Sequence, residues 1–230
     1  MELQAAEADA TMTTSGHTRL QAALNQQKNL LEEMRDAALL EGNALMLHPV
    51  PTNITELVQH VVEQMRPRYE IAECALNLRV SEGVPLAWCD PHRIRRVVFN
   101  VLDNALRYTS SCRDDGLVEV TLTYETQRVL CQVRDNGRGI APDDLQRLGQ
   151  KFTRLARGEH DTEGMGLGLN FCIGILRLSN GSLDLTSPGL GHGTTVLIRL
   201  PIPPIAVTMG SAKANDSDSP GADRQEGTVR

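Results

Sequence analysis

Aromatic residues are scarce in this sequence, at 3% against 40% apolar residues in all. A hydrophobic core must therefore be built from leucine, valine, isoleucine and alanine. A basic excess is also missing, because the formal net charge is −6. General nucleic-acid binders usually carry a positive surplus, so we expect no nucleic-acid partner. The 230 residues suffice for one domain with appendages.

Paired cysteines are absent as well. The five cysteines stand at positions 74, 89, 112, 131 and 172, an odd number without a Cys-x-x-Cys motif. This spacing fits neither a disulfide framework nor a zinc site, so we interpret them as reduced thiols of a cytoplasmic protein. No apolar run approaches the ~20 residues that a bilayer requires. We expect any membrane anchor to lie outside this chain.

A helical pattern covers residues 19–46. Six of the eight positions with 4-3-4-3 spacing are apolar: Leu20, Leu24, Leu31, Met34, Ala38 and Leu45. Such a seam predicts a bundle or coiled-coil helix that can form a homodimer, and the alternative is an amphipathic helix packed on its own domain. We assign residues 1–18 to a disordered start and 19–48 to a partial dimerisation or linker helix. His48 and Pro49 end this helix.

Alternating helices and strands fill residues 49–203. Asn53 and Glu56 have capping-box spacing, and Asp90-Pro91 opens a second helix. We predict helices at 53–66, 91–109, 142–149 and 168–179, and strands at 75–80, 117–124, 128–134, 182–187 and 193–200. The strands 117–124 and 128–134 form a hairpin. Several antiparallel neighbours predict an α+β sandwich with helices covering one sheet. Residues 204–230 have the composition of a disordered tail.

Three segments carry candidate chemistry. On the helix 91–109, Asn100, Asn104 and Arg107 share one stripe, which combines neutral oxygen ligands for a hard cation with positive charge for phosphate. Asp135 follows a strand and precedes two glycines, and its carboxylate can accept a hydrogen bond from an exocyclic amine. A Gly-x-Gly-x-Gly run at 164–168 opens the next helix, where backbone N–H groups can bind an anion.

Four stretches resemble the sequence boxes of histidine kinases, in that family's order and spacing. RRVVFNVLDNALRYTS resembles the N box, DNGRGIAPDDL the first glycine box and KFTRL the phenylalanine box. GMGLGLNFCIGILRLSNGSLDLTSPGLGHGTTVLIRLP resembles the second glycine box and the strands after it. The resemblance implies a two-layer Bergerat sandwich in which residues 49–203 are the ATP-binding catalytic domain. It also implies that the helix at 19–46 is the second helix of a dimerisation domain.

The resemblance also assigns roles to single residues. Asn104 would hold Mg²⁺ with help from Asn100, Arg107 would meet the phosphates, and Asp135 would take the adenine amino group. Arg154, with Phe152, would belong to a mobile lid near the γ-phosphate. The remaining nucleotide-binding positions would be Tyr108, Gly137, Gly139, Ile140, Gly164, Gly166, Leu167, Gly168, Leu169, Thr194 and Thr195.

One position distinguishes the subfamilies. Hydrolysing members of this superfamily carry a glutamate base where Asn100 stands, and an amide cannot take a proton from water. We therefore expect transfer of the γ-phosphoryl group to a histidine rather than hydrolysis. Two alternatives stay open: a nucleotide-binding regulatory module without kinase activity, and a serine kinase of the anti-sigma type.

The acceptor is the main departure from the family. The histidine-acid motif of the dimerisation domain is missing, and His17 lacks the following acid. His17 also lies too close to His48 for a two-helix hairpin to return between them. We expect the acceptor histidine on a dimerisation domain that is incomplete here, and a response regulator as the next partner.

Overall fold

The structure is a computed structural model that describes residue 39 and residues 44–112, 114–148 and 167–203. The expectations for residues 1–18, for most of the helix 19–46, for 149–166 and for the tail 204–230 lie outside these described residues. The elements follow in the order β1 (Val50–Thr52), α2 (Ile54–Ile71), β2 (Ala75–Val80), β3 (Ala87–Cys89), α3 (Pro91–Ser110), β4 (Leu117–Glu125), β5 (Arg128–Asp135), α5 (Leu167–Leu178), β6 (Ser182–Thr186) and β7 (Thr195–Pro201).

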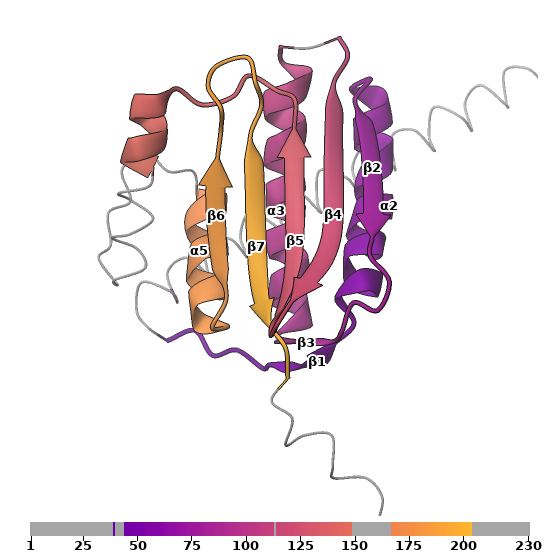
Figure 1. Cartoon of the computed structure of the whole chain (residues 1–230), viewed down its shortest axis with the longest axis vertical. Coiled ribbons are helices and arrows are strands. Elements are labelled where there is room, and N and C mark those ends of the chain that lie inside the picture. The colour runs from indigo at the N-terminus through magenta and orange to yellow at the C-terminus, as the bar shows by residue number, and fades with distance from the viewer. Residues whose placement is uncertain (1–38, 40–43, 113, 149–166, 204–230) are drawn as a thin grey trace, which may run out of the picture.

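The strands of the main sheet stand in the order β2-β4-β5-β7-β6. β2 runs parallel to β4, and the other neighbouring pairs are antiparallel. The helices α2, α3 and α5 lie together on one face of this sheet (Figure 1). The expected α+β sandwich with a mixed, largely antiparallel sheet is confirmed, as is the hairpin of β4 and β5.

The core fills the space between the helices and the sheet. On α3, Ile94, Val98, Val101 and Ala105 are all at most 5% exposed, as their spacing predicts. They belong to one core cluster with buried valines and leucines from the sheet, including Val118 and Val133 from β4 and β5. Aliphatic side chains dominate this core, so the low aromatic content is no obstacle to folding.

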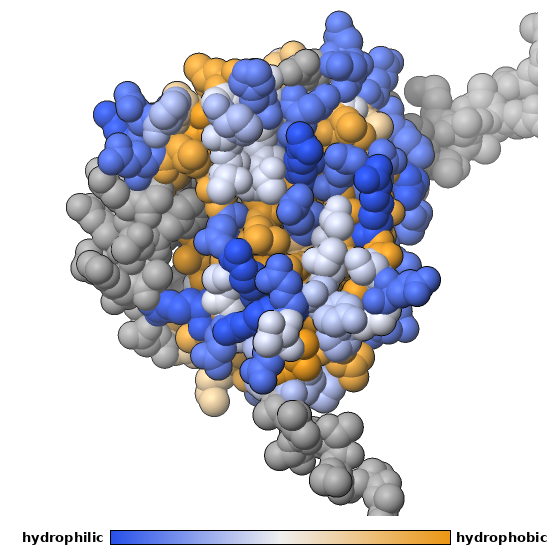
Figure 2. Space-filling model, in the orientation of Figure 1, coloured by the Kyte–Doolittle hydropathy of each residue, from blue (hydrophilic) through white to orange (hydrophobic). Residues whose placement is uncertain are grey.

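The other face of the sheet is more polar. Cross-strand neighbours there include Glu119 beside Arg134 and Thr121 beside Gln132. These residues alternate along their strands with the buried valines, because successive strand side chains point to opposite faces. Figure 2 shows this side of the molecule, where hydrophilic side chains surround smaller apolar areas. The helices α2, α3 and α5 lie behind the face seen in this figure, as Figure 1 shows.

Side-chain caps fix both long helices. Asn53 Oδ1 accepts the Glu56 N–H at 3.3 Å at the start of α2. Asp90 Oδ1 accepts the N–H groups of His92 and Arg93 at 3.1 and 3.3 Å at the start of α3. Both caps stand at the predicted positions, because these side chains satisfy N–H groups that lack a helical partner.

Two expectations about element bounds were wrong, and one pair of short strands was not predicted. The helix predicted to reach residue 46 ends earlier, because residues 44–49 are not helical. The Ala44 N–H donates to the Leu39 carbonyl, and Leu45 packs into the core. α2 continues to Ile71 rather than 66, because Pro67 is accommodated inside it. The short strands β1 and β3, which pair antiparallel, were not predicted.

None of the five cysteines forms a disulfide; four are buried and Cys112 is exposed. In the described part of the chain, no helix is long and apolar enough to cross a membrane.

Candidate nucleotide-binding site

The polar stripe of α3 borders the start of α5. Asn100 is only 9% exposed, Asn104 is half-buried and Arg107 is exposed. The Asn100 Nδ2 atom is buried without a hydrogen-bond partner in the described residues. Gly168 lies against it, since a Cβ atom at this glycine would stand 3.4 Å from Nδ2. A buried unsatisfied donor of this kind indicates a place for a further acceptor.

Asp135 ends β5 and is oriented by backbone groups. Its Oδ1 accepts the N–H of Gly137 at 2.9 Å and the N–H of Thr194 at 3.1 Å. In the described residues no other hydrogen bond reaches the carboxylate, so Oδ2 is available as an acceptor. The side chain is 7% exposed, and desolvation by burial raises the pKa of Asp135 while the two N–H groups oppose that rise.

Two glycines allow the chain to turn closely beside Asp135. A Cβ atom on Gly137 would lie 2.5 Å from the Tyr108 carbonyl oxygen. Gly139 has a φ of +67°, and its Cβ would lie 2.0 Å from the Gly189 carbonyl oxygen. Neither position tolerates a side chain. Both glycines are thus required by the packing of neighbouring backbone, in addition to any contact with a base.

Tyr108 joins α3 to this turn. The Arg138 N–H donates to the Tyr108 carbonyl at 3.1 Å, and the Arg138 guanidinium lies 4.5 Å from the centre of the Tyr108 ring. The ring is 39% exposed, so one part of it remains open beside the stacked arginine. Stacking of this kind holds an aromatic ring in one orientation.

The two candidate threonines are placed differently, Thr194 just before β7 and Thr195 as its first residue. Thr194 makes two hydrogen bonds with Asp135: its N–H donates to the side-chain Oδ1, and its carbonyl accepts the Asp135 backbone N–H. Thr195 pairs with Arg134 and Thr186, whose side chains belong to the face away from the helices. The structure therefore brings Thr194 to the site and separates Thr195 from it. Ile140, half-buried, donates its N–H to Ser187 Oγ at 3.0 Å and supports the turn.

The remaining predicted positions divide into two groups. Leu167, Gly168 and Leu169 form the first turn of α5. Outside the described residues lie Phe152, Arg154, Gly164 and Gly166.

Three residues beside the site were not predicted from the sequence. Arg138 stacks on Tyr108, and Gly193 approaches Asp135 so closely that a Cβ would lie 1.9 Å from its carbonyl oxygen. Asp103 contacts Arg107 within α3. The i,i+4 spacing of Asp103 and Arg107 is a sequence signal that could have identified this pair.

The described residues fit a magnesium nucleotide. The available Oδ2 of Asp135 can accept an adenine amino group, and the unsatisfied Asn100 Nδ2 can donate to a phosphate or ribose oxygen. The amide oxygens of Asn100 and Asn104 are neutral ligands suited to Mg²⁺, and Arg107 supplies a matching positive charge for phosphate.

Comparison with known proteins agrees with this geometry. Residues 89–204, half of the chain, match the family described as "Histidine kinase-, DNA gyrase B-, and HSP90-like ATPase". The adaptive-response sensory kinase SasA of Synechococcus sp. (strain JA-3-3Ab) is 29% identical over 187 residues, which cover 81% of this chain and 48% of that kinase. The chain thus spans about half the length of this relative.

Solved structures show the same fold. The histidine kinase AdeS of Acinetobacter baumannii superposes with a TM-score of 0.60 at 22% identity, over 80% of this chain and 83% of that one. Full-length ShkA in complex with AMPPNP gives a TM-score of 0.60 at 26% identity, over 75% of this chain and 35% of that one. Together with the orientation of Asp135 and the polar stripe of α3, these matches establish that the chain belongs to the histidine kinase-, DNA gyrase B- and HSP90-like ATPase family, and that its fold is that of histidine kinase catalytic domains.

Proposed function

We propose that this domain binds MgATP and transfers its γ-phosphoryl group to a histidine of a dimerisation domain. Asp135 accepts the adenine amino group, and Tyr108 lies along the nucleotide. Arg107 binds the phosphates, while Asn104, with Asn100, holds Mg²⁺. When bound, the metal neutralises phosphate charge. Sequence similarity to sensory kinases and the nucleotide complex of ShkA support this assignment.

The orientation of Asp135 is the observation that carries the proposal. Its carboxylate is buried, yet two backbone N–H groups hold it at a strand end with one oxygen available. Burying a carboxylate is costly unless its oxygens are hydrogen-bonded or paired with a charge, so the oxygen without a partner in the described residues indicates a place for a ligand donor. The fixed acceptor Asp135 suits the base of a nucleotide, and the amides of Asn100 and Asn104 with the guanidinium of Arg107 on α3 suit its phosphates.

The identity of residue 100 favours transfer over hydrolysis. An amide cannot act as a general base, so water near Asn100 is not activated by this side chain. Phosphoryl transfer depends mainly on positioning and on charge neutralisation, which Arg107 and the asparagine stripe provide. The nucleotide is then held until the histidine arrives.

The acceptor domain and a response regulator are the proposed partners. A structural neighbour is a complex of the histidine kinase ThkA with its response regulator TrrA, which supports a partner of this class. We further propose that a helix within residues 19–46 contributes to a homodimer and that the domain acts in the cytoplasm, if necessary attached to a membrane by other segments.

Calorimetric titration with MgATP, followed by a transfer assay, tests the proposal. Saturable binding is expected, and γ-labelled phosphate should pass to an added helical hairpin that carries an acceptor histidine. The label should be acid-labile and base-stable, as expected for phosphohistidine. An acid-stable label on serine would favour the anti-sigma type of kinase, and binding without any transfer would favour a regulatory module.

A further inference from the structure

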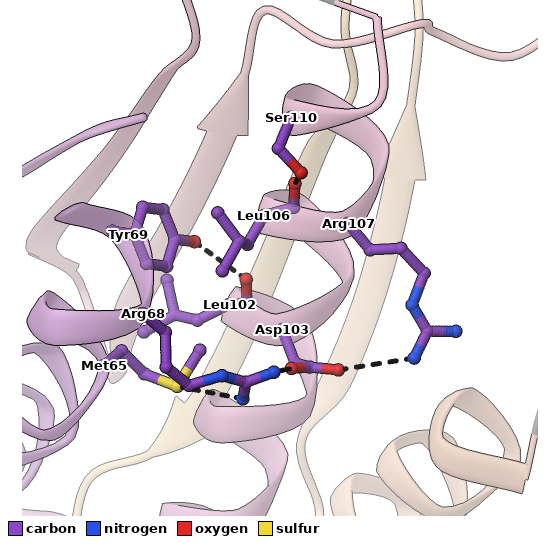
Figure 3. A network of polar contacts seen from close by, with 8 residues as sticks. All are labelled: Met65, Arg68, Tyr69, Leu102, Asp103, Leu106, Arg107 and Ser110. Atoms are coloured by element: carbon purple, nitrogen blue, oxygen red, sulfur yellow. Dashed lines mark hydrogen bonds and ion pairs between the residues drawn. The ribbon is translucent and has the colours of Figure 1, made fainter. Parts of the chain in front are cut away.

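One carboxylate on α3 is shared by two arginines. Asp103 contacts Arg68 of α2, with 2.7 Å between Arg68 Nη2 and Asp103 Oδ1. Its other oxygen lies 3.6 Å from Arg107 Nη2 on the opposite side. Figure 3 shows the carboxylate between the two guanidinium groups, with Arg107 directed away from α2. The three side chains form one charged network across two helices.

The sharing is unequal. An N–O distance of 2.7 Å is that of a strong charge-assisted contact, whereas 3.6 Å is that of a loose ion pair. The Asp103 side chain is 24% exposed, so water screens its charge incompletely, while the Arg107 side chain is 67% exposed. Arg68 thus forms the stronger ion pair with Asp103, and Arg107 stays accessible to another anion.

Packing of α2 on α3 fixes this arrangement. The Arg68 guanidinium lies 5.9 Å from the centre of the Phe99 ring, and its Nη1 lies 3.8 Å from the Met65 sulfur. One residue further, the Tyr69 hydroxyl donates to the Leu102 carbonyl at 2.7 Å. Arg68 lies outside residues 89–204, which match the family, and outside the four sequence boxes.

We propose that Arg68 is a positioning residue for nucleotide phosphate binding, because it neutralises Asp103 and so keeps Arg107 available. This inference rests on the proposed function of Arg107. Without Arg68, the full negative charge of Asp103 would draw Arg107 into a close pair and repel an approaching phosphate. With Arg68 in place, the network carries a net positive charge and holds Arg107 loosely.

Titration of four variants of the full chain with MgATP tests this role. Arg68→Gln keeps most of the side-chain stem and removes the charge; we expect the Kd for MgATP to rise about fivefold, the upper range for a partly exposed charge pair. Arg68→Lys should restore most of the affinity. In the double variant Arg68→Gln/Asp103→Asn the unbalanced charge is gone, and the Kd should return to within about twofold of the original value.

Tyr69→Phe is the matched control. It removes a contact between the same two helices, one residue from Arg68, without altering any charge. Its Kd for MgATP should stay unchanged while its thermal midpoint falls. Adenosine, followed by NMR at millimolar concentration, should bind all variants alike, since it carries no phosphate.

Three results would overturn the inference: an unchanged Kd in Arg68→Gln, equal weakening of adenosine and MgATP, or failure of Asp103→Asn to suppress the defect. In each of these cases MgATP binding by the unaltered chain would leave the proposed function intact. If the unaltered chain does not bind MgATP, the proposed function itself is wrong, and the role of Arg68 falls with it.

Discussion

At the scale of single residues, the two carboxylate oxygens of Asp135 have different roles, one in the fold and one in ligand recognition. Oδ1 is committed to the backbone of Gly137 and Thr194, and Oδ2 is left for a ligand. An asparagine could keep the first task, because its Oδ1 can accept the same two N–H groups. Its Nδ2 would then face the ligand and present a donor to the adenine amino group, which is also a donor.

Asp135→Asn should therefore weaken nucleotide recognition and spare the fold. We expect the affinity for MgATP to fall about 10- to 100-fold, the value of a hydrogen bond to a charged acceptor. The unfolding free energy of the ligand-free protein should be unchanged or higher, because a buried charge is removed. Calorimetric titration and urea unfolding measure both effects; a strongly destabilised variant would contradict the assignment of Oδ1.

The pH dependence of stability provides a second test of the same carboxylate. Burial raises the pKa of Asp135 in the folded state. A raised folded pKa contributes stability below the unfolded pKa, and this stability is lost as the pH rises through the folded pKa. The advantage of Asp135→Asn in urea unfolding should thus be largest at neutral pH and shrink in acid. An advantage that grows in acid would contradict the raised pKa.

Thiol reactivity should be dominated by one of the five cysteines. Burial raises the pKa of Cys89 to about 11 and that of Cys131 to about 12, and these thiols are inaccessible in the fold. Cys112 is exposed, with its thiol donating to the Tyr108 carbonyl at 3.2 Å. Ellman's reagent should react quickly with one thiol per chain, and Cys112→Ser should remove this phase. Two or more fast thiols would show that the core opens readily.

Asp135 and Asn100 could be proposed from the sequence because each belongs to a motif with a chemical reason for its residue type, whereas Thr194 was named only through the family resemblance. Thr195 was an equal candidate, because two adjacent threonines can be told apart only once the direction of each side chain relative to the sheet is known. Arg68 was missed for another reason: its role depends on α2 packing beside α3, a contact between segments 35 residues apart in the chain at the Arg68–Asp103 pair.

At the scale of elements, the caps of the helices were the most predictable features. Asn53 stands at the start of α2 and Asp90 at the start of α3, because their side chains can accept N–H groups that have no partner within the helix. β1 and β3 could not be predicted, since strands of three residues are too short to show alternation. The parallel pairing of β2 with β4 also requires a crossover that local patterns do not encode.

Replacement of the α3 cap should lower stability measurably. Asp90 Oδ1 caps the helix, and its Oδ2 accepts the His48 N–H at 3.1 Å, so it also attaches the entering chain. Asp90→Ala should cost about 1–2 kcal/mol of unfolding free energy. Asp90→Asn is the control, because it keeps an oxygen for the helix and loses only an acceptor for His48. Equal losses in both variants would show that the contact with His48 outweighs the cap.

At the scale of the whole molecule, the two-layer arrangement determines where chemistry can occur. The helices occupy one face of the sheet, and Asp135 is directed toward that layer because it is paired with the buried Val118. Asn100 approaches from α3, and Gly168 from the start of α5. The start of α5 thus meets α3 at Asn100, and the turn after Asp135 meets α3 at Tyr108, through the close approach of Gly137. The sequence boxes name these segments, but the contacts between them depend on the fold.

The central claim is that the domain holds ATP intact for a histidine. The most direct measurement is to equilibrate the chain with γ-labelled MgATP in the absence of any partner, and to determine both the bound fraction and the chemical state of the recovered nucleotide. The account predicts saturable binding, with the nucleotide recovered as ATP after many minutes. Steady release of phosphate by the chain alone would contradict it, because Asn100 provides no base, and so would failure to bind MgATP at all.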